Sequence, residues 1–207
     1  MVGGILVMVG WFWDITTLKS ILPQFVAMKF TTAFCFFLSG ATLYYIIRSC
    51  QEETQVNDLF LIFINFIIIL VMASLLLSVF FDIRTGLENL FVSEMEGAIN
   101  TPVPGRPALL VMLSFMLIAS SGLLSLSKKT VNYLIIRIVG VIIMIVGAVA
   151  IIGYLLDMPK LYGQFGFISS AVALHTAFLL VLVGLGLTAV SSNFLNKTHK
   201  AIYEVTK

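Results

Sequence analysis

The stretch 59–81 reads LFLIFINFIIILVMASLLLSVFF, 23 residues without a charged side chain. An α-helix needs about 20 consecutive apolar residues to cross the hydrocarbon core of a bilayer, which is about 30 Å thick. The stretch therefore predicts a transmembrane helix. Further apolar runs of comparable length occur elsewhere in the chain, at 29–47, 108–126, 131–156 and 168–190.

A sixth apolar run opens the chain, but it is short. Residues 2–13 precede Asp14 and would extend only about 18 Å at 1.5 Å per residue. We therefore expect the first helix to be shortened or incomplete. The sequence as a whole predicts an all-α fold, a polytopic membrane helical bundle of about six transmembrane helices.

The composition supports a membrane protein. Hydrophobic residues make up 60% of the 207 residues and charged residues 11%, and the mean hydropathy is +1.09. Soluble domains are about 45–50% apolar and about 25% charged. The excess apolar surface needs lipid as its solvent, so we expect the lipid bilayer as a partner. A formal net charge of +2 gives no indication of a nucleic-acid partner.

The distribution of Lys and Arg predicts the topology. Seven of them fall in one set of connections, namely Arg48, Lys128, Lys129, Arg137, Lys197, Lys200 and Lys207. Five fall in the opposite set, namely Lys19, Lys29, Arg84, Arg106 and Lys160. Cytoplasmic loops carry the excess of positive charge. We expect a multi-pass protein of the cell membrane with both termini in the cytoplasm, a transmembrane domain at 1–190 and a cytoplasmic tail at 191–207.

A threefold internal repeat is the strongest pattern in the sequence. The units are 1–50, 58–127 and 131–190, and each combines an apolar helix, a connection and a second helix. The connections begin at Asp14, Asp82 and Asp157. Repeats of like direction predict three parallel helical hairpins around an axis near the membrane normal.

Small residues recur at like positions in the repeats. Gly40, Gly122 and Gly184 occupy the second helices, and Gly140 and Gly147 form a stripe in the run 131–156. Small residues let membrane helices approach closely, so we expect all five to serve helix packing.

Candidate chemical residues are few. The sequence has no P-loop, no Gly-rich dinucleotide fingerprint and no Ser–His–Asp order, which argues against an enzyme. Cys35 and Cys50 lack metal-ligand spacing, so no metal site is expected. His175 is the one histidine within an expected span, which argues against a haem held by two histidines. His175 either bonds to a neighbour within the bundle or has a sensing, ligand or proton-linked role.

The remaining polar candidates are threonines and aspartates. Thr31, Thr32 and Thr176 lie near the starts of the second helices, and Thr31 aligns with His175. Asp14, Asp82 and Asp157 either cap helix ends or jointly form a ligand site. No cofactor can be named from these residues.

Several short elements carry a resemblance to a known family. They are GWFWDI at 10–15, LKSILP at 18–23, MKFTTA at 28–33, PGR at 104–106 and ALHTA at 173–177. The chain resembles the N-terminal membrane region of bacterial and archaeal sensor histidine kinases and diguanylate cyclases. Residues 107–110, PALL, depart from the more polar run of that family. Its members usually continue into PAS, kinase or cyclase domains, and 191–207 is too short to be an output domain.

The leading hypothesis is a non-catalytic sensory or signal-input module that relays a signal through its helices to a cytoplasmic partner or output domain. An accessory subunit of a larger membrane complex is the alternative, and a small transporter or channel is a weaker one. Other membrane proteins, a cytoplasmic signalling domain and a homo-oligomer are the partners that these readings imply.

Overall fold

The computed structural model describes residues 1–22, 25–51, 55–89, 92, 103–163 and 170–205, and these are the described residues below. Within them the chain is helical and has no strand. The helices are α1 (Val2–Phe12), α2 (Thr16–Lys19), α3 (Phe30–Gln51), α4 (Gln55–Phe81), η1 (Leu87–Asn89), α5 (Leu109–Ser125), α6 (Thr130–Leu155), η2 (Pro159–Tyr162) and α7 (Leu174–Val205). The all-α prediction is confirmed for this part of the chain.

Four of these helices, α3, α4, α6 and α7, are long and apolar enough to cross a membrane. The other two apolar helices are shorter. α5 has 17 residues, about 25 Å, and α1 has 11 residues, about 16 Å. The limited length of α1 agrees with the expectation for the first run, and the predicted total of six spans exceeds the four that length and composition support.

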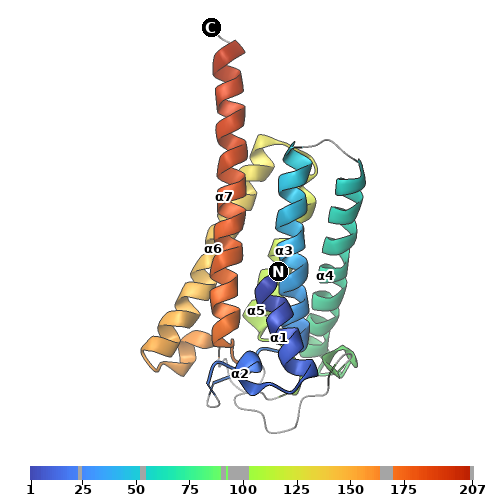
Figure 1. Ribbon diagram of the computed structural model, residues 1–207, viewed down its shortest axis with the longest axis vertical. Helices are drawn as coiled ribbons and strands as arrows, with labels where there is room; N and C mark the ends of the chain where they lie inside the picture. The colour runs from blue at the N-terminus through green and yellow to red at the C-terminus, as the bar shows by residue number, and fades with distance from the viewer. Residues whose placement is uncertain (23–24, 52–54, 90–91, 93–102, 164–169, 206–207) are drawn as a thin grey trace.

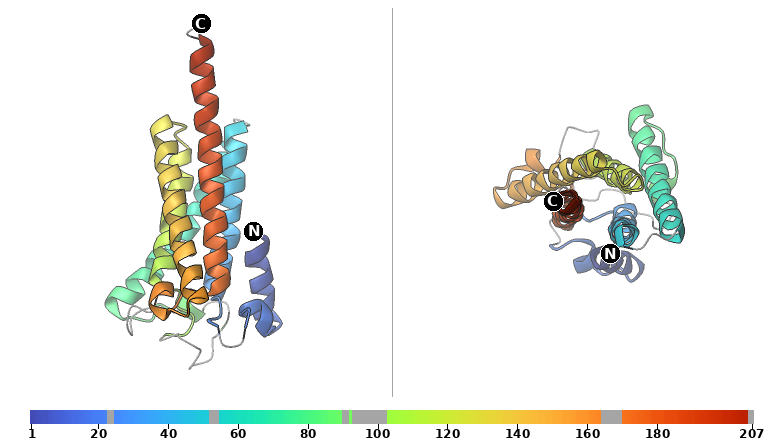
Figure 2. Two further views of the ribbon diagram at one scale, coloured as in Figure 1. Left: turned by 90° about the vertical axis from the view of Figure 1, so that its left-hand side faces the viewer. Right: turned by 90° about the horizontal axis from the view of Figure 1, so that it is seen from above.

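The long helices run side by side and alternate in direction (Figure 1). α1, α4 and α6 end at one end of the bundle, where α3, α5 and α7 begin; we call it the aspartate end because Asp14, Asp82 and Asp157 lie there. The opposite end is the tail end. α1 starts about half-way along α3, and α7 extends well beyond the other helices at the tail end (Figures 1 and 2).

The bounds of α7 differ from the predicted run 168–190. The helix begins at Leu174, and residues 168–169 lie outside the described residues. Just before the helix, the Val172 N–H donates to the carbonyl oxygen of Tyr162 at 2.7 Å, so this backbone bonds to another segment. The helix also continues beyond residue 190 to Val205, since the sequence 191–205 contains no Gly or Pro to end it.

α6 and α7 pack closely through their glycines. A Cβ atom added to Gly140 would lie 2.8 Å from the carbonyl oxygen of Gly184, and one added to Gly184 would lie 2.5 Å from that of Gly140. A Cβ on Gly147 would lie 2.6 Å from the carbonyl oxygen of Ala177. Each separation is too short for a real side chain, so the two backbones touch along this seam.

Gly122 and Gly40, the other two glycines predicted to serve helix packing, also lie at close contacts. A Cβ on Gly122 would overlap the side chain of Asn65 in α4, and one on Gly40 would lie 2.5 Å from the amino nitrogen of Met1. The five glycines therefore occupy tight positions between elements.

Large apolar side chains cover the outside of the bundle as well as its interior. On α4, Phe63 and Phe66 are 63% and 59% exposed, whereas Ile68 and Met72 on the same helix are fully buried. A helix that is apolar on every side is typical of a protein core or a membrane. The exposed aromatic face of α4 therefore fits contact with lipid.

Candidate functional site

The three aspartates end their helices in the same way. Asp14, Asp82 and Asp157 have φ angles of 54°, 51° and 51°, in the left-handed region. The next residue donates its N–H to the carbonyl oxygen five positions back in every case, at 2.8 Å for Ile15, 3.2 Å for Ile83 and 2.8 Å for Met158. This bond is the hallmark of the Schellman motif, in which the left-handed position is usually Gly.

An aspartate is an uncommon choice for this position. The left-handed conformation costs a residue with a Cβ about 1–2 kcal/mol, although Asp and Asn tolerate it better than most residues. A carboxylate at a helix C-terminus also faces the negative end of the helix dipole. The three residues thus occupy the same position at the C-terminus of a helix.

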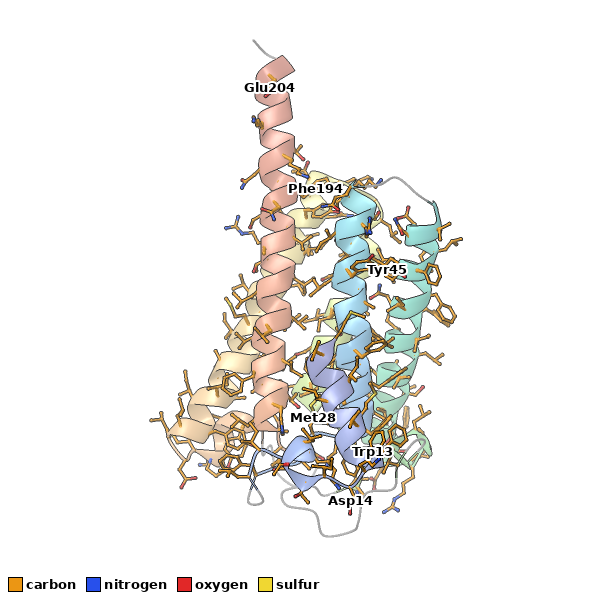
Figure 3. All side chains as sticks on the ribbon, in the orientation of Figure 1. Trp13, Asp14, Met28, Tyr45, Phe194 and Glu204 are labelled. Carbon is orange, nitrogen blue, oxygen red and sulfur yellow. The ribbon has the colours of Figure 1, made fainter. Side chains whose placement is uncertain are left out.

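The structure does not gather the three carboxylates into one site. The ends of α4 and α6, which carry Asp82 and Asp157, lie on opposite sides of the bundle (Figures 1 and 2). Asp14 points outward at the aspartate end (Figure 3) and pairs with Lys19. Among the described residues, no group of three His, Cys, Asp or Glu could hold a metal ion.

Two of the threonines line one small cavity. Thr32 of α3 and Thr176 of α7 line it together with Lys29, Ala108 and Ala173, where the first turns of α3, α5 and α7 meet. Its volume is about 10 Å³, enough for at most a single water molecule. Thr31, the residue before Thr32, is also buried, and its hydroxyl has no hydrogen-bond partner among the described residues.

His175 lies at a second and much larger pocket. This pocket has a volume of about 370 Å³ and lies between α1, α2 and α7. Its lining consists of Gly3, Leu6, Val7, Thr17, Leu18, Ile21, His175, Phe178 and Leu179. Both ring nitrogens of His175 are buried, and neither has a hydrogen-bond partner among the described residues. The described residues thus show no neighbour bonded to His175, which was one of the two alternatives for this residue.

The wall formed by α1 and α2 is held in place by local contacts. The Trp11 indole N–H donates to the carbonyl oxygen of Met28 at 2.8 Å, and the Met28 N–H donates to that of Lys19 at 2.9 Å. The Lys19 ammonium group also lies 4.8 Å from the centre of the Trp11 ring. These contacts fix the end of α1 against the segment that leads into α3.

A buried charged network at the aspartate end was not among the predicted sites. Glu88 of η1 and Arg106 are 6% and 4% exposed, with 4.0 Å between a guanidinium nitrogen and Oε1. The Ser78 hydroxyl donates to Glu88 at 2.6 Å, and Arg106 donates to the Ser78 hydroxyl oxygen at 2.7 Å. The Thr85 hydroxyl donates to the other carboxylate oxygen at 3.1 Å. The Ser170 hydroxyl donates to the Arg106 carbonyl oxygen at 2.8 Å, which ties the network to the start of α7.

Hydrogen bonding decides the charge state of Glu88. Burial on its own raises the pKa of this carboxyl, but hydrogen bonds from Ser78 and Thr85 outweigh burial, so the pKa lies below its usual value. Glu88 is therefore ionised at neutral pH. The sequence offered one signal for the network, the Pro-Gly-Arg element that contains Arg106, and none that identified Glu88 as its partner.

A polar residue also lies deep in the bundle. Asn65 of α4 is fully buried; its side-chain oxygen accepts a hydrogen bond from Thr42 of α3 at 3.0 Å, and its amide donates to the carbonyl oxygen of Leu61 at 2.7 Å. Asn65 was not among the residues predicted from the sequence to be functional.

At the tail end, α7 is held by aromatic stacking before it leaves the bundle. The rings of Phe194 on α7 and Tyr133 on α6 stack with centroids 3.7 Å apart. The Tyr133 hydroxyl lies 2.9 Å from the sulfur of Cys50 at the end of α3. A groove of about 630 Å³ lies beside this contact, between α3 and α7.

No protein-family model matches the sequence, and searches of curated proteins and of solved structures found no match either.

Proposed function

We propose that this chain is a non-catalytic membrane sensory or signal-input module. The observation that carries the proposal is α7, a single helix of 32 residues that borders the His175 pocket at one end and projects beyond the bundle at the other. A continuous helix is a rigid connection between a pocket and a cytoplasmic partner. The same module would relay its signal through residues 191–207.

The orientation belongs to the proposal as well. The tail end carries the larger number of Lys and Arg, which supports a cytoplasmic location for this end and for the C-terminus that projects from it, and an outward-facing aspartate end. The N-terminus lies about half-way along α3, so the predicted location of both termini in the cytoplasm receives this support for the C-terminus alone. The shared backbone geometry at Asp14, Asp82 and Asp157 supports three helical hairpins of one design, of which the first begins with a helix too short to cross the membrane alone.

Signal relay requires two arrangements of α7 that a ligand can distinguish. α7 meets α6 through the glycine seam at Gly140 and Gly184, where the two backbones touch. It meets α6 again at the Tyr133–Phe194 stack. A displacement of α7 at its start would pass along these two contacts to the projecting tail.

Affinity capture of the tagged full chain from its native membrane, followed by mass spectrometry, tests the proposal. We expect a cytoplasmic signalling protein or output domain, and we expect the Lys197→Glu/Lys200→Glu variant to reduce its capture at least tenfold. Lys160→Glu makes the same kind of charge change at the aspartate end and should leave capture within twofold of the unchanged chain. Recovery of several membrane proteins at fixed stoichiometry, equally in all variants, would instead favour the accessory-subunit alternative and overturn the sensory one.

A further inference from the structure

We propose that the His175 pocket binds a neutral, membrane-soluble molecule whose carbonyl or hydroxyl group hydrogen-bonds to the His175 imidazole. This inference rests on the proposed function and adds the chemical class of the signal molecule. Three features of the pocket carry it: the imidazole, the apolar wall and the position of the mouth.

The imidazole supplies the polar contact. A neutral imidazole has one N–H donor and one nitrogen acceptor. Both ring nitrogens of His175 are closed to solvent and have no partner among the described residues, so a ligand in the pocket reaches them when the side chain turns toward it. Leaving a buried polar group unbonded costs about 1–3 kcal/mol. A ligand carbonyl can accept from the N–H, and a ligand hydroxyl can donate to the other nitrogen. Either contact would remove part of that cost.

The wall selects a neutral and largely apolar molecule. Among the described residues that line the pocket, Thr17 is the one polar side chain besides His175; the others are glycine or apolar. No charged side chain of the described residues lines the pocket, and burying an unpaired charge is far more costly than burying a hydrogen-bonded neutral group. The volume of about 370 Å³ falls within the range of about 300–1,000 Å³ for small-molecule sites.

The mouth faces apolar surroundings. Leu6 of α1 and Phe178 of α7 line the pocket, and each is 49% exposed. α1 runs along the half of α3 nearer the aspartate end, as Figure 1 shows, and the exposed lining residues Leu6, Ile21 and Phe178 are apolar. A molecule dissolved in the hydrocarbon core can reach the pocket without crossing water.

The two histidines of the chain make a direct test possible. The His199→Gln variant retains His175 as its single imidazole, so ¹⁵N-histidine labelling reports this side chain alone in NMR spectra. The probes share a ten-carbon skeleton and differ in their head group: 1-decanol, 2-decanone, decanoate and decane, each added to the protein in phosphatidylcholine nanodiscs. We expect decanol and decanone to shift a His175 nitrogen signal in a saturable way, and decane and decanoate to leave it unchanged.

Two matched variants locate the binding. Leu6→Trp fills the pocket and should weaken the saturable shift at least tenfold. Ile5→Trp places the same large side chain at the neighbouring, 42% exposed position outside the lining and should change it less than twofold. Equal shifts with decane and decanol, or equal effects of the two tryptophans, would show general partitioning into lipid and overturn the site. A His175 nitrogen already hydrogen-bonded to the chain before any probe is added would overturn it too.

The NMR titration and the capture experiment can fail independently of each other. A saturable shift without any cytoplasmic partner in the capture experiment leaves the site standing and removes the signalling role. A captured partner together with no shift for any probe retains the signalling role and removes this ligand class.

Discussion

Substituting alanine for Gly105 should destabilise the protein far more than the same change at Gly86. Both glycines adopt left-handed backbone angles, with φ of +74° and +82°. A Cβ on Gly86 meets no atom within 4 Å, so Gly86→Ala carries the conformational cost alone, about 1 kcal/mol. A Cβ on Gly105 would overlap the carbonyl oxygen of Glu88 and lie 2.7 Å from its carbonyl carbon.

The additional cost at Gly105 comes from the charged network. The new methyl group would push η1 away and separate the buried carboxylate of Glu88 from Ser78 and Arg106. Breaking a buried charge pair costs about 3–5 kcal/mol, so Gly105→Ala should lower the free energy of unfolding by about 4 kcal/mol in total. The difference of about 3 kcal/mol between the two variants exceeds a hundredfold in the unfolding equilibrium constant.

The assay is unfolding by sodium dodecyl sulfate from mild detergent micelles, followed by circular dichroism. Gly86→Ala is the matched control, because it lies at a comparable backbone angle between α4 and α5. Equal destabilisation by the two substitutions would refute the reasoning, since backbone strain alone would then explain both.

Three further changes test other features by the same unfolding assay. Asp157→Gly should stabilise the protein by about 1 kcal/mol because it relieves a left-handed aspartate, and a loss of stability would assign the carboxylate another role. A double-mutant cycle of Asn65→Ala and Thr42→Ala should give a coupling of about 0.6–1.7 kcal/mol; strict additivity would contradict the bond between them. Because the pKa of Glu88 is lowered by folding, its stabilising contribution is full above about pH 5 and is lost as the pH falls through the lowered pKa. In the Glu88→Gln variant the free energy of unfolding should therefore fall less steeply as the pH is lowered. An unchanged fall would show that another group titrates in this range.

The helices themselves could be predicted from the sequence because hydrophobic length is a local property. The runs 29–47, 108–126 and 131–156 correspond to α3 (Phe30–Gln51), α5 (Leu109–Ser125) and α6 (Thr130–Leu155). The start of α7 could not be predicted this way. Residues 170–173 fall within the predicted apolar run but lie outside the helix, and they form hydrogen bonds to Tyr162 and Arg106, which are distant in the sequence.

The residues of the candidate site likewise divide into those that the local sequence predicts and those that depend on distant contacts. The aspartates were recognisable from their positions after apolar runs, and His175 from its isolation in one of them. Glu88 was not, because its environment depends on Ser78 and on Arg106, which is separated from Glu88 by the 17 residues 89–105. Pairing across such distances is set by tertiary packing, and a single sequence carries little information on it.

The contact between Gly140 and Gly184 divides α7 into a shorter part on the pocket side and a longer part on the tail side. Because the two backbones touch there, this contact is the point about which α7 would tilt. About 15 Å of helix separates Leu174 from Gly184, and about 31 Å separates Gly184 from Val205, at 1.5 Å per residue. A rigid helix tilting at that point would move its far end about twice as far as its start, and in the opposite direction.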